Sequence, residues 1–255
     1  MNIKAVCKYE LKDHKIPIII FYCVIVGLLI MLYISTVTLM RANTISGGQF
    51  SGMEMSTAIF LFICGLNSFK GTFRFTVQNG ISRKTLFISH LITTWTLAVV
   101  MAILDKIVLF IVNVIGNTNE NIVYKGILEL FYERRYLGNS SDLAMHLDGF
   151  LFAICMYAAV LMLGYFITNF YYKMNKGVKI GVSVGVPVGL FIVLPIVEET
   201  FTKGKIIAFL IKFLSFAFGF DNGFNPYYAI VTFIIIFAVF SVLSWILMSK
   251  SVVKD

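Results

Sequence analysis

Residues 226–248 have the sequence PYYAIVTFIIIFAVFSVLSWILM, an apolar run without a charged residue. A run of about 18–20 apolar residues is long enough to cross the hydrocarbon core of a membrane as a helix. Because lipid offers the backbone no hydrogen-bond partner, such a run is expected to be helical. Similar runs predict six membrane-spanning helices, at about residues 16–40, 53–69, 86–115, 149–172, 178–197 and 226–248.

The composition of the whole chain supports the same class. Of its 255 residues, 59% are hydrophobic and only 13% are charged, whereas roughly a quarter of a soluble domain is charged. The mean hydropathy of +0.89 indicates lipid as the solvent. We therefore expect an all-α polytopic membrane protein whose residues 1–255 form a single transmembrane domain.

The first 15 residues carry Lys4, Lys8, Lys12 and Lys15 among apolar side chains. A spacing of three or four residues places the lysines on one side of a helix. This pattern predicts an amphipathic helix over residues 1–15 that lies in the membrane interface. The alternative is a plain basic tail.

The distribution of Lys and Arg predicts the topology. Residues 1–15, 70–85 and 173–179 and the C-terminal tail hold 13 of these residues, whereas the intervening polar segments hold 7. Because cytoplasmic loops are enriched in Lys and Arg, both termini are expected in the cytoplasm. The same rule explains the net charge of +8 without nucleic acid. The low Trp and high Ile, Phe and Lys content suggests the plasma membrane of a bacterium.

Two segments between the predicted spans are apolar or amphipathic. Residues 206–220 are apolar but too short to cross and contain Lys212, which predicts a re-entrant or interfacial element. Residues 122–136 place several apolar side chains on one helical face. They predict a helix that forms a lid or lies on the lipid surface.

No enzyme motif is present, and we expect no catalytic residue and no metal site. The sequence lacks both GxxxxGK[ST] and HExxH, and His14, His90 and His146 lack acidic or Cys partners at ligand spacing. The acidic pair Glu198-Glu199 resembles the first motif of intramembrane CAAX-type proteases. Those proteases also need histidines further along the chain, and no histidine follows His146.

The polar stretch between the second and third spans carries the most informative pattern. Asn79-Gly80 tolerates the left-handed conformation at a helix end, and Ser82 is a good N-cap for the next helix. A short helix of about two turns is therefore expected before Asn79. It is a candidate contact for a soluble partner, and the alternative is an ordinary basic loop. The candidate contact residues are Arg74, Phe75, Gln78, Asn79, Gly80, Ser82, Arg83 and Lys84.

The run QNGISRKT at residues 78–85, placed between two of six spans, resembles the permease subunits of type-2 ABC exporters. That resemblance implies an interfacial N-terminal helix, a cytoplasmic coupling helix at residues 71–85 and a re-entrant element before the last span. It also implies a separate ATPase subunit, which holds ATP and Mg, and a second permease subunit. Many relatives carry an acidic residue in this loop, and residues 70–85 have none.

Gly177, Gly181, Gly185 and Gly189 recur every fourth residue. Such a stripe lets two helices approach closely. It predicts either a dimer or gating interface or close packing within one subunit.

Asp105-Lys106 interrupts the third apolar run. A charge at the centre of a bilayer is costly and usually marks function. Asp105, however, follows Ser82 by about 23 residues, or roughly 35 Å of helix. We expect the pair at the outer boundary, either as a gate or as an interfacial pair with access to water.

The favoured hypothesis is the membrane subunit of an ATP-driven exporter, without a directly bound cofactor. The apolar interior favours hydrophobic or amphipathic cargo, such as small peptides, over ions or sugars. The first alternative is a membrane sensor or immunity protein that binds peptide or lipid without transport. The second is an intramembrane hydrolase that uses Glu198 and Glu199.

Overall fold

The computed structural model describes residues 3–43, 48–117, 122–136 and 142–251. The described part is mainly helical and contains two short strands. The helices are α1 (Ile3–Arg41), α2 (Met53–Gln78), α3 (Arg83–Asn117), α4 (Ile127–Tyr136), α5 (Asp142–Lys173), α6 (Lys176–Val188), α7 (Leu194–Val197), α8 (Lys205–Ala217) and α9 (Pro226–Ser249). Two π-helical segments, Gly189–Val193 and Glu198–Thr202, continue the helix on either side of α7.

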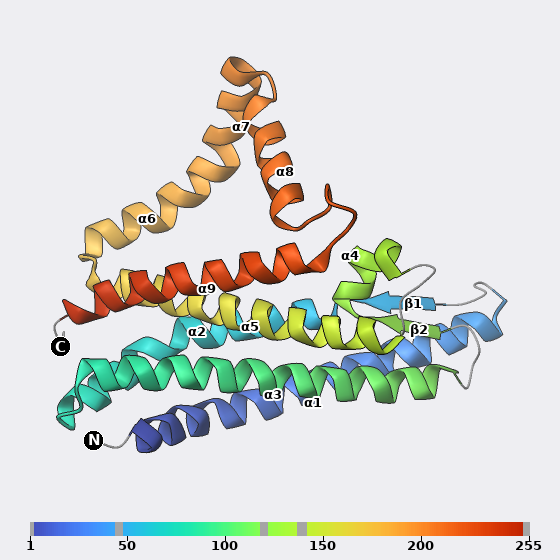
Figure 1. The fold of residues 1–255 in the computed structure, drawn as a ribbon, viewed down its shortest axis with the longest axis horizontal. Helices are drawn as coiled ribbons and strands as arrows, with labels where there is room; N and C mark the ends of the chain where they lie inside the picture. Colours follow the sequence, from blue (N-terminus) through green and yellow to red (C-terminus); the bar gives the residue numbers. More distant parts are fainter. Residues whose placement is uncertain (1–2, 44–47, 118–121, 137–141, 252–255) are drawn as a thin grey trace.

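Five long helices form a bundle along the long axis of the molecule, namely α1, α2, α3, α5 and α9 (Figure 1). Helix α5 packs against α2, α3 and α9, and α1 packs against α3. The core is correspondingly richest on α5, where Tyr157, Leu161, Met162 and Tyr165 are buried. These large side chains fill the space between the helices.

Five of the described helical segments are long and apolar enough to cross a membrane, which indicates a membrane protein. They contain the predicted spans at residues 16–40, 86–115, 149–172, 178–197 and 226–248. The predicted span at 53–69 lies in α2, which is not among the five. The predicted count of six is therefore not confirmed.

Helix α1 contains residues 3–15 of the helix expected at the N-terminus together with the first predicted span, and the interfacial position of its first part stays a prediction. It runs without a break for 39 residues, which is about 58 Å of helix. All four of its lysines are exposed, as the amphipathic pattern predicts. Its other face is buried against the bundle at Val6, Glu10 and His14.

Helix α2 corrects the expectation of a short helix before Asn79. That segment is not a separate helix, because α2 continues through Gln78. The span predicted at 86–115 lies in one helix, α3, which continues through Asp105-Lys106. The predicted boundary between the two helices is confirmed, since Asn79 caps the end of α2 and Gly80 adopts a φ of 69°. Ser82 accepts a capping hydrogen bond from the N–H of Thr85 at 3.3 Å.

A two-stranded parallel sheet replaces the first part of the helix predicted over residues 122–136. Strand β1 (Gly48–Ser51) pairs with β2 (Ile122–Lys125), with Gly48 opposite Ile122. The amide side chain of Asn113 on α3 holds β2, because it donates to the carbonyl of Tyr124 at 3.0 Å and accepts from its N–H at 2.9 Å. The short helix α4 follows at the same end of the bundle (Figure 1).

The segment from α6 to α8 forms a helical hairpin that projects away from the bundle (Figure 1). Neither α6 nor α8 has a buried residue. The turn between the two arms is made by Lys203 and Gly204, which both have positive φ. The predicted re-entrant element at 206–220 falls on α8 and on the turn after it, and its relation to a membrane stays a prediction.

Candidate functional site

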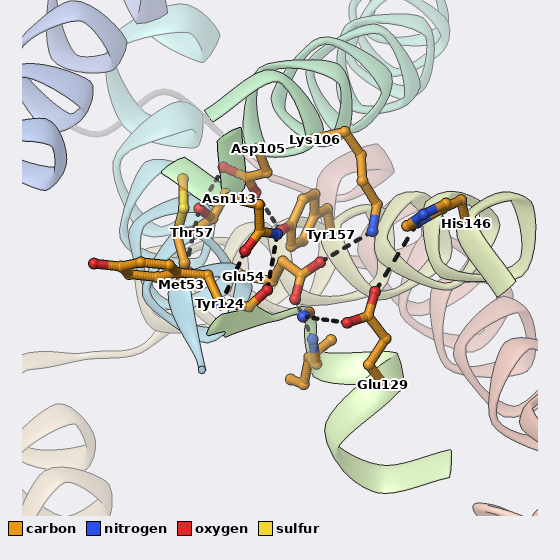
Figure 2. A network of polar contacts seen from close by, with 12 residues as sticks. Met53, Glu54, Thr57, Asp105, Lys106, Asn113, Tyr124, Glu129, His146 and Tyr157 are labelled. Carbon is orange, nitrogen blue, oxygen red and sulfur yellow. Dashed lines mark hydrogen bonds and ion pairs between the residues drawn. The ribbon is translucent and has the colours of Figure 1, made fainter. Parts of the chain in front are cut away.

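The bundle encloses a carboxylate that three other helices bind. Asp105 on α3 is only 2% exposed. It accepts hydrogen bonds from the hydroxyls of Tyr22 on α1 at 2.7 Å and Thr57 on α2 at 3.1 Å, and from that of Tyr157 on α5. We call these four residues the Asp105 cluster; part of it is drawn in Figure 2. This burial argues against the alternative of an interfacial pair with access to water, and the place of the pair relative to a membrane stays a prediction.

Lys106 faces a different partner, since neighbouring residues of a helix point in different directions. Its Nζ lies 3.5 Å from Oε1 of Glu54, which is buried in the first turn of α2. The second oxygen of Glu54 accepts a hydrogen bond from the N–H of Ile127, at the start of α4 (Figure 2). Glu54 thus neutralises Lys106 and caps α4, so one carboxylate joins α2, α3 and α4.

A second carboxylate, that of Glu129, also lies at the beginning of α4. Glu129 accepts from the N–H of Gly126 at 3.3 Å and lies 4.0 Å from Nδ1 of His146 on α5. Farther along α4, Tyr132 donates to the carbonyl of Phe218 at 2.7 Å. Burial raises the pKa of Tyr132 to about 12, so this hydroxyl stays protonated over the physiological range.

A second polar cluster occupies the opposite half of the bundle. Nδ1 of His90 lies 3.9 Å from Glu10, and the His90 ring stacks on Tyr165 with 3.7 Å between centroids. His14 lies 3.4 Å from the hydroxyl of Ser68. The histidines lack acidic partners at ligand spacing in the sequence, yet folding brings Glu10 to His90 and Glu129 to His146. Even so, the described residues include no group of His, Cys, Asp and Glu placed to hold a metal ion.

The candidate contact residues between α2 and α3 separate into two groups. Gln78, Asn79, Gly80, Ser82 and Lys84 are exposed. The others are engaged in the fold. Arg83 donates to the carbonyl of Ser249 at the end of α9, Phe75 stacks on Tyr9 of α1 at 4.6 Å, and Arg74 is partly buried.

The glycine stripe lies on an open surface of the chain. A Cβ added at Gly177, Gly181, Gly185 or Gly189 would have no atom within 4 Å. The alternative of close packing within one subunit is therefore wrong for this stripe. The close helix contact lies elsewhere, between Gly65 of α2 and Gly164 of α5, where an added Cβ would clash with the facing backbone.

The acidic pair Glu198-Glu199 does not act as a unit. Glu198 is buried, accepts from Thr202 Oγ1 at 2.8 Å and from the N–H of Ile207 at 3.0 Å, and so caps α8. Glu199 is exposed. Their contacts assign a structural role to Glu198 and bring no histidine to either residue among those described.

Two adjoining apolar cavities lie at the end of the bundle that carries the sheet. One, of about 180 Å³, is bounded by α1, α3 and the strands, and the other, of about 270 Å³, by α1, α3 and Tyr124. Leu29, Val112 and Tyr124 line both cavities. Their walls suit an apolar group, since most of the lining side chains are aliphatic.

The sequence around several of these residues gives no sign that they bind Asp105. Tyr22, Thr57 and Tyr157 lie in apolar runs, where tyrosine and threonine are ordinary. Glu54 was detectable in principle, as an acidic residue at the edge of an apolar run, whereas nothing near Glu10 in the sequence points to its partner His90. No protein-family model, curated protein or solved structure matches the chain. Its function is therefore argued from these residues and their geometry.

Proposed function

We propose that this chain is the transmembrane permease subunit of an ATP-driven exporter of the type-2 ABC class. It moves hydrophobic or amphipathic cargo, such as small peptides, out of a bacterial cell. Both termini lie in the cytoplasm. A separate ATPase docks at the turn between α2 and α3.

The arrangement of the chain ends supports six crossings. The hydroxyl of Ser89 donates to the carbonyl of Ile3, and Arg83 donates to that of Ser249. Both ends of the described chain thus lie beside the first turns of α3, at one end of the bundle (Figure 1). A chain that begins and ends on one side crosses an even number of times. The five apolar segments and α2 make six.

The observation that carries the proposal is the way the α2–α3 turn is built into the bundle. Its tip is exposed, and it lies at the same end as the α1 lysines and the α5–α6 turn (Figure 1). Next to the exposed tip, Arg83 donates a hydrogen bond to α9, and Phe75 stacks on an aromatic ring of α1. A force applied at the tip therefore reaches α1, α2, α3 and α9 together. A coupled ATPase requires such a connection, because it drives transport by binding two states of the permease differently.

Two further features fit the cargo and the second subunit. The cavities at the far end are lined mainly by aliphatic side chains, which suits an apolar or amphipathic molecule. The open stripe of Gly177, Gly181, Gly185 and Gly189 allows close approach of a helix from outside this chain. We assign that helix to the second permease subunit.

The test is affinity purification of the full chain in mild detergent from native membranes, followed by an assay for a co-eluting Walker-A protein and for ATP hydrolysis. The test variant is Lys84→Glu with Gln78→Ala, since both side chains are exposed and neither supports the fold. The control is Lys4→Glu, which makes the same change of charge on α1. Arg83 is left unchanged because it holds α9.

An ATPase that elutes with the wild type and the control, but not with the test variant, supports the exporter. If no ATPase elutes with any of them, the proposal fails and the sensor or immunity hypothesis replaces it. If loss of ATPase is equal in the test and control variants, docking depends on charge alone and the turn has no special role.

A further inference from the structure

A basic groove opens at the end of the bundle that carries the α2–α3 turn. It has a volume of about 440 Å³ and lies between the last turns of α2, the end of α5 and the start of α6. Lys70, Arg74, Lys176 and Lys179 line it, and no acidic residue does. Lys70 and Arg74 lie one turn apart on α2, and Lys176 and Lys179 one turn apart on α6, so two basic helix faces meet across the groove.

Three lysines of this groove, Lys70, Lys176 and Lys179, form no ion pair within the described part of the chain. The described residues include no carboxylate within 4.0 Å of Lys70, Lys176 or Lys179. The start of α6 adds a further positive potential. Its N-cap residue, Asn175, makes no capping hydrogen bond with its side chain, and the unpaired N–H groups of a first helical turn attract anions. Asn175 itself lines the groove.

The surroundings of the groove are apolar, which distinguishes a lipid from a soluble anion. Phe170 at the end of α5 is 40% exposed, and Val178 and Ile180 on α6 are 52% and 67% exposed. An amphipathic anion can place its charged group between the basic side chains and its acyl chains along this apolar face. Basic pockets at the ends of spanning helices bind anionic headgroups in this way.

We propose that this groove binds the phosphate-bearing headgroup of an anionic phospholipid, with its acyl chains against the start of α6. Lys70, Lys176 and Lys179 suit the phosphate oxygens because each ammonium group is a point charge with three donors. Bound there, the lipid holds α2, α5 and α6 at one point and fixes the base of the α6–α8 hairpin. The proposal does not rest on ATP-driven export.

The experiment is titration of the detergent-purified full chain with phosphatidylglycerol, read by native mass spectrometry. The test variant is Lys70→Gln with Lys176→Gln. The matched control, Lys4→Gln with Lys15→Gln, removes two exposed lysines from α1 that do not line the groove. A surface cation contributes about fivefold to the binding of an anionic lipid, so the test variant should bind about 25-fold more weakly. The control should bind like the wild type.

Further arms identify the ligand and guard against misfolding. Lys70→Arg with Lys176→Arg keeps the charge and should retain binding, while circular dichroism and a monodisperse elution profile check the fold of every variant. Phosphatidylcholine should bind more weakly than phosphatidylglycerol, and inorganic phosphate alone should not displace the lipid. Equal weakening in test and control variants, or equal binding of phosphatidylcholine, overturns the proposal. Displacement by inorganic phosphate at the same concentration overturns the lipid assignment in favour of a free phosphate.

Discussion

Nζ of Lys106 lies 3.5 Å from Oε1 of Glu54, and the two residues come from the end of the bundle where α2 begins. The preceding residue, Asp105, is bonded on another side of α3 by three hydroxyls. Two consecutive residues of α3 are therefore stabilised in different ways: Lys106 by an ion pair, and the carboxylate of Asp105 by hydrogen bonds from neutral hydroxyls. Both lie within the bundle, where unpaired charge is costly.

Replacing Lys106 with Met should destabilise the fold by about 3 kcal/mol, because it leaves the buried Glu54 carboxylate without its cation. Adding Glu54→Gln should recover part of that loss, since the carboxylate left without its cation is then replaced by a neutral amide. The measurement is unfolding in sodium dodecyl sulfate, followed by the fluorescence of Trp95 and Trp245. Lys125→Met is the control: its partner Glu133 is 54% exposed, and a surface pair is worth less than about 1 kcal/mol. Equal losses for Lys106→Met and Lys125→Met would contradict the buried pair.

Replacing Asp105 with Ala should cost more than replacing it with Asn. Alanine leaves the hydroxyl of Tyr157 without an acceptor, and an unsatisfied buried group costs about 1–3 kcal/mol. The hydroxyls of Tyr22 and Thr57 keep only the backbone carbonyls of Met101 at 3.2 Å and Met53 at 3.5 Å. Asparagine keeps one carbonyl oxygen and should lose about half as much. Tyr22→Phe removes a single donor and should cost about 1–2 kcal/mol. The same unfolding assay ranks the three variants, and an equal loss for Ala and Asn would show that the hydroxyls find other acceptors.

The long apolar helices and the α2–α3 boundary were predictable because their signals are local. Hydropathy over one run places α9, and Asn79-Gly80 followed by Ser82 marks a helix end and the next start. The continuity of α2 through Gln78 was missed. Polarity suggests the end of a span, yet a helix already formed extends through Lys, Arg and Gln at little cost.

The Asp105 cluster and the tight α2–α5 contact depend on residues far apart in the sequence. Tyr22 and Tyr157 become partners of Asp105 only once α1, α3 and α5 are packed, and their own surroundings are simply apolar. The glycine pattern drew attention to α6, but Gly65 and Gly164 meet as single glycines on two helices. A glycine repeat within one helix predicts a surface that another helix can approach closely. It does not predict whether that other helix belongs to the same chain.

That difference gives a direct comparison of glycines. Gly164→Ala should strongly destabilise the fold, by several kcal/mol, because its Cβ would clash with the backbone of α2 at Phe62. Gly181→Ala should leave the subunit as stable or up to about 1 kcal/mol more stable, since alanine favours a helix. If the stripe contacts a second subunit, Gly181→Ala should nevertheless reduce dimers in crosslinking of intact membranes. A stable Gly164→Ala protein would show that α2 and α5 separate more easily than their packing implies.

Glu198 and Glu199 offer a test of the hydrolase alternative. Glu198→Ala should loosen the hairpin, because it removes acceptors for Thr202 and for the N–H of Ile207, and loss of a helix cap costs about 1 kcal/mol. Glu199→Ala should have no such effect, since that side chain is exposed. Protease cleavage near Gly204 measures the difference. If Glu199→Gln abolishes a cellular function of the chain that needs no ATPase, while the hairpin resists protease as in the wild type, the hydrolase alternative replaces the exporter.

Arg83 and Lys84 separate the structural and coupling roles of the α2–α3 turn. Arg83→Gln should expose the last turn of α9 to faster hydrogen exchange around Ser249 and cost about 1.5–3 kcal/mol, because it removes a charged donor from that carbonyl. Lys84→Gln should change neither, since its side chain is exposed. If an ATPase docks at the tip, however, Lys84→Gln should lower transport-linked ATP hydrolysis while leaving stability intact. Transport lost only with Arg83→Gln, in step with its stability, would place the functional contact of the ATPase elsewhere on the basic end of the bundle.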